Sequence, residues 1–146
     1  MSDKFSFELV TPEGVAFEAE VYQATLPTPD GDITVLPHHQ PLITLVSAGV
    51  IALTPHTSDT INQIDYYATN GGVAEIDGRR VRLLADAAER ADDIDEMKAK
   101  EALERARELQ RRSTDHVSLA DATALIEHNT ARLRVAELRR RKQRTS

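Results

Sequence analysis

Two adjacent histidines, His38 and His39, are the residues of this 146-residue chain that most directly suggest a metal site. No further histidine or carboxylate lies near them at the spacing of a zinc site, so we interpret them as part of a polar loop. Ser113 and Ser118 are close in sequence to His116, but proximity in sequence does not create the geometry of a catalytic triad. We therefore expect neither a catalytic residue nor a metal site.

Nucleotide chemistry and nucleic-acid binding also lack their usual patterns. No glycine-rich loop ends in Lys-Ser or Lys-Thr, which excludes a catalytic P-loop. Gly71 and Gly72 resemble a fragment of a nucleotide-binding loop, but they precede a strand rather than a helix, which favours a hairpin turn. The basic cluster at 139–144 belongs to an acidic chain without interleaved aromatic residues, so it indicates a solvated helix end rather than a nucleic-acid site.

The distribution of charge divides the chain in two. The net charge is −6, yet residues 1–86 hold 4 Lys and Arg against 12 Asp and Glu, whereas residues 87–146 hold 14 against 12. This change of sign predicts two segments with different roles. The chain has no cysteine, which excludes disulfides and thiolate metal sites.

Residues 4–86 show the alternation that is typical of β-strands. Apolar residues alternate with polar ones in two early runs, Phe5, Phe7 and Leu9, then Val15, Phe17, Ala19 and Val21. Such alternation places one side of each strand in a core and the other in solvent. Turns rich in Pro, Asp and Gly separate the runs, which predicts an antiparallel sandwich or barrel. Asp77 and Gly78 lie between two such runs and predict a type I′ hairpin turn.

From residue 92 onward the apolar residues recur with the period of an α-helix. Asp92, with Asp95 three residues later, predicts a capped helix start. Capping and a favourable dipole interaction explain this acidic cluster, which includes Asp93, better than an acid–base pair does. The apolar face that follows is made of Ala99, Ala102, Leu103, Ala106 and Leu109.

A second helix is predicted after a polar break at 111–116. Ser118 and Asp121 have capping-box spacing. The apolar face runs to about residue 140 and carries Leu119, Ala122, Ile126, Leu133 and Ala136. Both helices have narrow, alanine-rich faces, and at about 25 cal/mol per Å² such a seam stabilises docking only modestly. We therefore expect a helical hairpin that can detach.

Together these patterns predict an α+β fold with two domains. Residues 1–88 form an N-terminal antiparallel β-sandwich, and residues 89–146 form a C-terminal two-helix antiparallel hairpin. No apolar run approaches the ~20 residues that span a bilayer, and the first residues do not resemble a signal peptide. We expect a soluble, cytoplasmic protein that meets a membrane only through a partner.

Four segments, in register over most of the chain, resemble the epsilon family of F-type ATP synthases. The first is Gly31-Asp-Ile-Thr-Val-Leu-Pro-His-His-Gln-Pro-Leu-Ile-Thr44, in which an acidic turn and an apolar strand lead into a Pro-x-His-x-Pro-Leu sequence. The others lie at 71–73 with 83–89, at 94–95 and at 132–138. The bacterial epsilon form fits better than the mitochondrial delta form, because no transit peptide precedes Phe5.

The resemblance implies a non-catalytic subunit of the central stalk, or rotor. Such a subunit binds the gamma subunit and the membrane-embedded c-ring, and it couples proton flow to ATP synthesis. Its C-terminal helices can extend along gamma towards the alpha and beta subunits, where they inhibit ATP hydrolysis. The implied location is peripheral, at the cytoplasmic face of the cell membrane. The turn Asp30-Gly31-Asp32 and the loop with His38 and His39 are expected to form one end of the sandwich that faces the c-ring.

No cofactor is required in this family, but some members bind ATP at the hairpin as a regulatory ligand through an Ile/Leu-Asp-x-x-Arg-Ala motif and later arginines. The matching residues here are Ile94, Asp95, Lys98, Ala99, Arg105 and Arg132. Lys98 replaces the arginine of the motif and lacks its planar, bidentate fork. His128 replaces another arginine. These two differences leave ATP binding open.

Two other functions are compatible with the residues alone. A β-sandwich with a helical hairpin could be an interaction module of another complex, which co-purification with alpha, beta and gamma subunits would distinguish. An unrecognised small enzyme is the other alternative, and the absence of hydrolysis by the isolated chain would exclude it.

Overall fold

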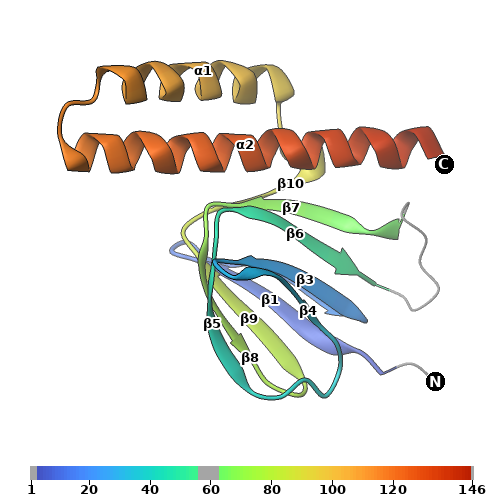
Figure 1. Cartoon of the computed structure of the whole chain (residues 1–146). Helices are drawn as coiled ribbons and strands as arrows, with labels where there is room; N and C mark the ends of the chain where they lie inside the picture. Colours follow the sequence, from blue (N-terminus) through green and yellow to red (C-terminus); the bar gives the residue numbers. More distant parts are fainter. Residues whose placement is uncertain (1–2, 56–62, 146) are drawn as a thin grey trace.

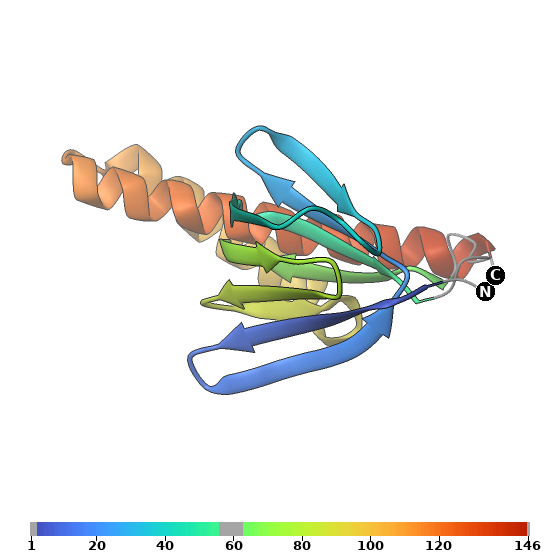
Figure 2. The same ribbon diagram turned by 90° about the horizontal axis from the view of Figure 1, so that it is seen from below.

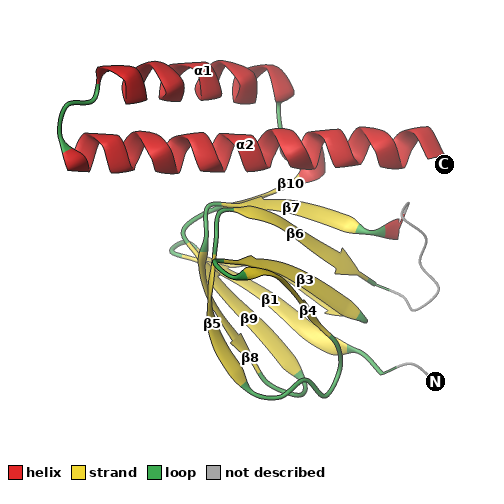
Figure 3. Cartoon of the chain, in the orientation of Figure 1, coloured by secondary structure: helices red, strands yellow, loops and turns green. Residues whose placement is uncertain are grey.

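The computed structural model describes residues 3–55 and 63–145. Strands fill the first part of the chain and two helices the second, with a short 3-10 helix, η2 (Ala91–Asp93), between them (Figures 1 and 3). The helices are α1 (Glu96–Arg112) and α2 (His116–Thr145). The strands are β1 (Phe5–Thr11), β2 (Gly14–Val21), β3 (Gln23–Thr28), β4 (Gly31–Val35), β5 (Leu42–Val46), β6 (Gly49–Thr54), β7 (Asp65–Thr69), β8 (Gly72–Ile76), β9 (Arg80–Ala85) and β10 (Ala88–Arg90).

The strands form two five-stranded sheets that pack as a sandwich. Sheet A has the order β2-β1-β9-β8-β5, and sheet B has the order β10-β7-β6-β3-β4. The predicted sandwich followed by a helical hairpin is therefore confirmed. One pair, β1 with β9, is parallel, whereas the other pairs described are antiparallel. Alternation along a strand reports which residues face the core, and it does not report the direction of the neighbouring strand.

A β-bulge changes the direction of one predicted core residue. Leu9 pairs with Phe17 while Val10 pairs with Val15, so β2 carries one extra residue, Ala16. Such an insertion turns the side chains beyond it to the other face of the sheet. Phe17 consequently faces the core, whereas Val15 is 58% exposed, and its predicted inward position is wrong.

The turn between β8 and β9 also differs from the prediction. A type I′ turn needs positive φ at its central residues, but Gly78 does not have positive φ. Instead, a carboxylate oxygen of Asp77 accepts hydrogen bonds from the N–H groups of Arg79 and Arg80, each at 2.8 Å. The side chain of Asp77 thus closes the hairpin, and these hydrogen bonds hold its pKa below the usual value.

Gly71 and Gly72 connect the two sheets rather than two strands of one hairpin. β7 belongs to sheet B and β8 to sheet A, so the predicted hairpin turn is wrong. Gly71 has φ +103°, which suits glycine. The turn between them lets the chain cross from one layer of the sandwich to the other.

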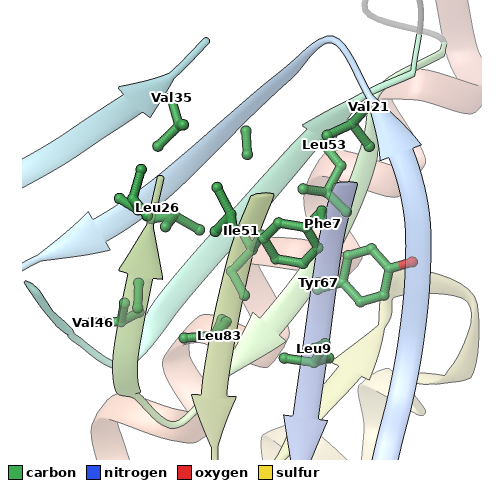
Figure 4. Packing of buried hydrophobic residues seen from close by; sticks show 14 of the residues in the cluster. Phe7, Leu9, Val21, Leu26, Val35, Val46, Ile51, Leu53, Tyr67 and Leu83 are labelled. Carbon is green, nitrogen blue, oxygen red and sulfur yellow. The ribbon is translucent and has the colours of Figure 1, made fainter. Parts of the chain in front are cut away.

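The core lies between the sheets and is made of the inward residues of both (Figure 4). The predicted alternation of Phe5, Phe7 and Leu9 is confirmed, since each is at most 3% exposed. The rings of Phe17 and Tyr67 meet across the layers with centroids 5.2 Å apart. Further members of the core are Leu26, Val35, Ile51, Leu53 and Leu83. All the buried members of this core lie in strands. Because they bury the inner face of each sheet, the opposite face of each sheet points outward.

Both helices begin with an aspartate cap, each at a different residue from the predicted one. Asp95, rather than Asp92, caps α1 and accepts a hydrogen bond from the N–H of Lys98 at 3.1 Å. Asp115, rather than Ser118, provides the cap of α2, and its two carboxylate oxygens accept hydrogen bonds from the N–H and hydroxyl groups of Ser118. Aspartate accepts these bonds as readily as serine, so spacing alone does not decide between them.

The two helices form an antiparallel hairpin that lies on the outer face of sheet B (Figure 1). α2 has 30 residues and is thus about 45 Å long, longer than the predicted helix ending near residue 140. The hairpin extends beyond the sandwich on the side of its loop (Figures 1 and 2). Leu109 and Leu119, which were predicted to face a neighbour, are accordingly 52% and 41% exposed. No helix in the described part of the chain is both long and apolar enough to cross a membrane.

Candidate functional site

The outer face of sheet A carries a row of apolar side chains that crosses all five strands. Pairing brings Val15 of β2 beside Val10 of β1, then Leu84, Val73 and Leu45 on the following strands. We call these five residues the apolar row. Leu45 is 62% exposed, and Leu84 is 39% exposed even in a central strand. In contrast with sheet B, nothing in the described chain covers this face.

A charged row runs parallel to the apolar row, two residues along β1, β8 and β9 and three along β2, where the bulge intervenes. Glu18, Glu8, Arg82 and Glu75 are neighbours in register across four strands. The Nε of Arg82 lies 3.4 Å from a carboxylate oxygen of Glu8, whereas Glu8 and Glu18 lie opposite each other with like charge. Like charges in directly opposed positions destabilise a sheet slightly, so this row suits a partner that supplies a cation.

The predicted loops towards the c-ring lie at opposite ends of one strand. The turn with Asp30, Gly31 and Asp32 precedes or begins β4, and His38 and His39 follow its end. Figure 2 shows the β3–β4 turn and the β4–β5 connection at different ends of the sandwich. The expectation that these loops form one end is therefore wrong. The motif spans a whole strand, β4, and a strand of five residues separates its two ends by about 16 Å.

Each of these two loops is held by its own contacts. The hydroxyl of Thr28 closes the β3–β4 turn by hydrogen bonding to the carbonyl of Gly31, and Gly31 has φ +117°. At the other end, the N–H of His38 donates to the carbonyl of Gly78 at 2.9 Å. The Nε2 of His38 lies 2.8 Å from Asp3. The histidines thus belong to the end of the sandwich that contains the β8–β9 turn.

The hairpin is attached to sheet B through a small apolar cluster. Ala131, Val135 and Ala136 of α2 are each at most 5% exposed. They pack with Ala68, Ala91 and Ile94, and Val50 and Tyr66 lie against the same cluster. Four of the six buried members are alanine, so the cluster buries little apolar surface for its length, as the narrow predicted faces imply.

Polar contacts add to this attachment, and the main one joins β10 to α2. The Nε of Arg132 lies 2.9 Å from a carboxylate oxygen of Glu89, and its side chain is only 17% exposed. The Nε2 of His128 lies 3.8 Å from the same oxygen. Burial is the main cause that lowers the pKa of His128; Glu89 opposes this effect and Arg132 adds to it. One carboxylate therefore faces two basic side chains.

The residues that match the ATP motif have different surroundings. Ile94 and Ala99 are buried at 4% and 0% exposure, and Asp95 caps α1. Lys98 and Arg105 are exposed on α1. Arg132 is bound to Glu89. The apolar members thus serve the helix packing, and only the three basic residues have side chains that could hold a phosphate.

The remaining candidates from the sequence have structural roles. The hydroxyl of Ser113 donates to the carbonyl of Leu109 at 2.6 Å, and Ser118 bonds to Asp115. Among residues 3–55 and 63–145, no group of three or more His, Cys, Asp or Glu side chains could hold a metal ion.

Two functional features were missed in the sequence. Glu89 lies 43 residues from Arg132, and no periodicity links a short edge strand to a distant helix. The apolar row was missed because its members come from five strands and only pairing brings them together. Its one local signal is the apolar run Leu42–Val46, which is too continuous for a strand with one face in water.

Comparison with known proteins agrees with this architecture. The family model described as ATP synthase, Delta/Epsilon chain, beta-sandwich domain matches residues 4–91. The ATP synthase epsilon chain of Herpetosiphon aurantiacus is 37% identical over 93% of this chain and 96% of its own length. That of Carboxydothermus hydrogenoformans is 40% identical over 78% of this chain and 81% of its own.

Solved structures share the fold at lower identity. A chain of the mitochondrial ATP synthase of Euglena gracilis, in an assembly of OSCP, F1 and c-ring, has a TM-score of 0.76 and 21% identity, and the match covers 92% of this chain and 81% of that one. A chain of the central stalk and c-ring of the Tetrahymena thermophila enzyme has a TM-score of 0.58 and 12% identity, with 90% and 98% covered.

The fold and its exposed face define a class of protein, a β-sandwich subunit with a docked helical hairpin. Within this class, the chain belongs to the ATP synthase delta/epsilon family. The resemblance of its four sequence segments to this family is confirmed.

Proposed function

We propose that this chain is the epsilon subunit of an F-type ATP synthase, a non-catalytic part of the central stalk. In this role it binds the gamma subunit and the c-ring and couples proton flow to ATP synthesis at the cytoplasmic face of the cell membrane. Family membership and relatives that carry the name ATP synthase epsilon chain support this proposal. A generic module of another complex has no comparable support.

The observation that carries the proposal is the apolar row on sheet A. Val15 and Leu45, at the two ends of the row, are 58% and 62% exposed, as ordinary surface side chains are. The five residues of the row are nevertheless contiguous across the sheet. Contiguous apolar surface flanked by charge is typical of protein interfaces. We assign this face to the gamma subunit. Because the hairpin lies on sheet B, the face is accessible whether or not the hairpin is docked (Figure 1).

We assign the contact with the c-ring to the β3–β4 turn alone. Asp30 and Asp32 are exposed at its tip, and exposed loops at the end of a rigid sandwich are frequent binding elements. The separation of His38 and His39 from this turn removes them from the same contact. They remain near the N-terminal strand and the β8–β9 turn.

The hairpin is proposed to regulate ATP hydrolysis by leaving sheet B. Its apolar attachment is small, and its ion pairs can exchange for pairs with other subunits, which suits an element with two arrangements. ATP would act here as a regulatory ligand held by Lys98, Arg105 and Arg132. In this chain such binding has to compete with Glu89 for Arg132.

A pull-down with the gamma subunit tests the proposal. We expect the full chain to bind gamma and Leu45→Lys to weaken binding at least about tenfold, because the substitution would bury an unpaired ammonium group in an apolar interface. Leu36→Lys is the matched control, since Leu36 is 45% exposed but lies outside the apolar row. Equal binding by both variants would contradict the assigned face, and no binding by the unaltered chain would contradict the proposed function.

A further inference from the structure

A cavity of about 320 Å³ lies between the last turns of α2 and the sandwich. Arg139 and Lys142 of α2 line it on one side, and Arg90, Asp65 and Tyr66 line it on the other. Its volume falls within the range of small-molecule sites, about 300–1,000 Å³. None of the residues that match the ATP motif lines this cavity, so it is separate from that site.

The charged groups around the cavity differ in their exposure. The side chains of Arg139 and Lys142 are only 27% and 28% exposed. The two carboxylates that also line it, Asp92 and Asp65, are 72% and 46% exposed, so water screens their charge more strongly. Arg90 is also exposed, so the excess of positive charge at the cavity is that of three basic side chains over two acidic ones.

The tyrosines on the wall do not change this balance. Burial raises the pKa of Tyr66, and it raises the pKa of Tyr67 to about 12. Both phenols remain neutral at physiological pH and add no negative charge to the cavity.

Arg139 also has a side-chain donor that no described residue accepts from. Its Nη1 donates to the carbonyl of Ala91 at 3.1 Å and lies 4.0 Å from Asp92. Its Nε is buried and has no hydrogen-bond partner in the described part of the chain. A buried donor without a partner is uncommon in folded proteins, and an acceptor from a ligand would satisfy it.

We propose that this cavity binds a small anion with a phosphate or diphosphate group. The guanidinium groups of Arg139 and Arg90 would form charge-assisted hydrogen bonds to such oxygens, together with the ammonium group of Lys142, which also donates to the carbonyl of Ile64 at 3.0 Å. The volume admits a diphosphate, and the three cations come from β10 and α2.

The position of the cavity gives the ligand an effect on the hairpin. Arg90 belongs to the sandwich, whereas Arg139 and Lys142 belong to α2, so a bound anion links the two parts. A ligand that binds only the docked arrangement favours it by a factor of about one hundred at one hundred times its Kd. The anion would hold the hairpin on sheet B. This inference does not depend on the face assigned to gamma.

Calorimetric titration of the full chain with pyrophosphate tests the proposal. We expect saturable binding that Arg90→Gln and Arg139→Gln each weaken about ten- to hundredfold, the usual effect of losing one hydrogen bond to a charged group. Arg90 is exposed, so its replacement keeps the fold even if Arg139→Gln disturbs docking. Arg134→Gln is the matched control, because Arg134 is an exposed arginine of α2 outside the cavity.

Each outcome decides the question. Absence of binding to the unaltered chain at millimolar pyrophosphate overturns the proposal. An equal loss in Arg134→Gln indicates nonspecific attraction and also overturns it, as does unchanged binding by both cavity variants.

Because a diphosphate can be free or part of a nucleotide, ADP is titrated in parallel, with Lys98→Gln to remove a contribution of the ATP-motif residues. ADP binding that is lost in Arg90→Gln but kept in Lys98→Gln supports the cavity with a nucleotide as the source. If ADP binding is lost only in Lys98→Gln, ADP binds at the ATP-motif residues, and the ligand of the cavity is free pyrophosphate.

Discussion

Gly72 lies where a neighbouring strand leaves no space for a side chain. A Cβ atom at this position would overlap the carbonyl oxygen of Leu84 and lie 3.0 Å from the Cα of Ala85. Both neighbours are backbone atoms of β9, so they cannot move aside as a flexible side chain would. The absence of a Cβ at Gly72 is thus what lets β8 pair with β9 directly after the crossing between the sheets.

We predict that Gly72→Ala lowers the free energy of unfolding by about 1–3 kcal/mol, the usual cost of overpacking. Urea denaturation followed by circular dichroism measures this. Gly78→Ala is the matched control, because its nearest neighbour would lie 3.7 Å away and its φ is not positive. Equal stability of the two variants would show that β9 moves freely, contrary to the close approach described.

His128 makes hairpin docking depend on pH. Burial, aided by Arg132, lowers its pKa in the docked arrangement, so the docked hairpin binds a proton less readily than a detached one. Docking free energy is therefore complete above the ordinary histidine pKa of about 6.5 and decreases as the pH falls below it. The groups that face the imidazole are Glu89 of β10 and Arg132 of α2.

We predict that the hairpin detaches more readily at pH 5.5 than at pH 7.5, and that His128→Gln reduces this dependence. Amide hydrogen exchange of Val135 and Ala136 reports it, since both are fully buried in the docked arrangement. The exchange rates should be compared after correction for intrinsic pH effects. A pH dependence of equal size in His128→Gln would assign the effect to other groups.

At the scale of elements, the sequence patterns correctly predicted the strands, helices and buried faces that depend only on residues close together in the sequence. The alternation of Phe5, Phe7 and Leu9 located a strand and its buried face, because side-chain direction follows from the backbone geometry. The apolar period after residue 95 located both helices, and Ala99, Leu103 and Ala106 are buried as predicted. Errors arose where a single residue changed the local geometry, as Ala16 does in the bulge of β2.

The candidate site was harder to predict because its parts lie on different elements. The apolar row needs the pairing of five strands, including one parallel pair. The pair of Glu89 and Arg132 needs the position of α2 on sheet B. Neither arrangement leaves a period in the sequence. The family motif gave the two loops and the apolar strand between them, but the expectation of a single end did not take the length of this strand, β4, into account.

This separation leads to a prediction about the c-ring. In the assembled enzyme, a cysteine at Asp32 should form disulfide cross-links with c subunits that carry an introduced cysteine in the loop facing the stalk, because the β3–β4 turn is the exposed end that we assign to that contact. A cysteine at His39 should not, since it lies beyond the other end of β4. Gel analysis of both variants after oxidation measures this. Cross-links from His39 and none from Asp32 would reverse the assigned orientation.

At the scale of the whole molecule, two surfaces of different chemistry lie on opposite sides of the sandwich. The apolar row covers the outside of sheet A, and the basic α2 covers the outside of sheet B. Residues 132–144 contain seven Lys and Arg and the single acid Glu137. In the docked hairpin, Arg132 binds Glu89 of β10, and the Nζ of Lys142 lies 3.8 Å from a carboxylate oxygen of Asp65 of β7. The basic side chains of α2 that attach the docked hairpin to the sandwich can thus bind other acidic partners once the hairpin detaches.

The last prediction concerns the detached hairpin as a brake on ATP hydrolysis. Extended beside gamma, the basic end of α2 could bind acidic surfaces of the catalytic subunits through several ion pairs, although each exposed pair contributes only about 0–1 kcal/mol. We expect deletion of residues 118–146 to raise hydrolysis by the assembled enzyme without impairing assembly, because the apolar row is retained. Replacing Arg139, Arg140 and Arg141 with Ala should give part of this effect.

Inhibition by the hairpin should also weaken with added salt, since the screening length falls below about 8 Å above physiological ionic strength. Steady-state hydrolysis at several salt concentrations measures both effects. Hydrolysis unchanged by the deletion would restrict the helices to a structural role, and inhibition independent of salt would assign the brake to apolar contacts instead.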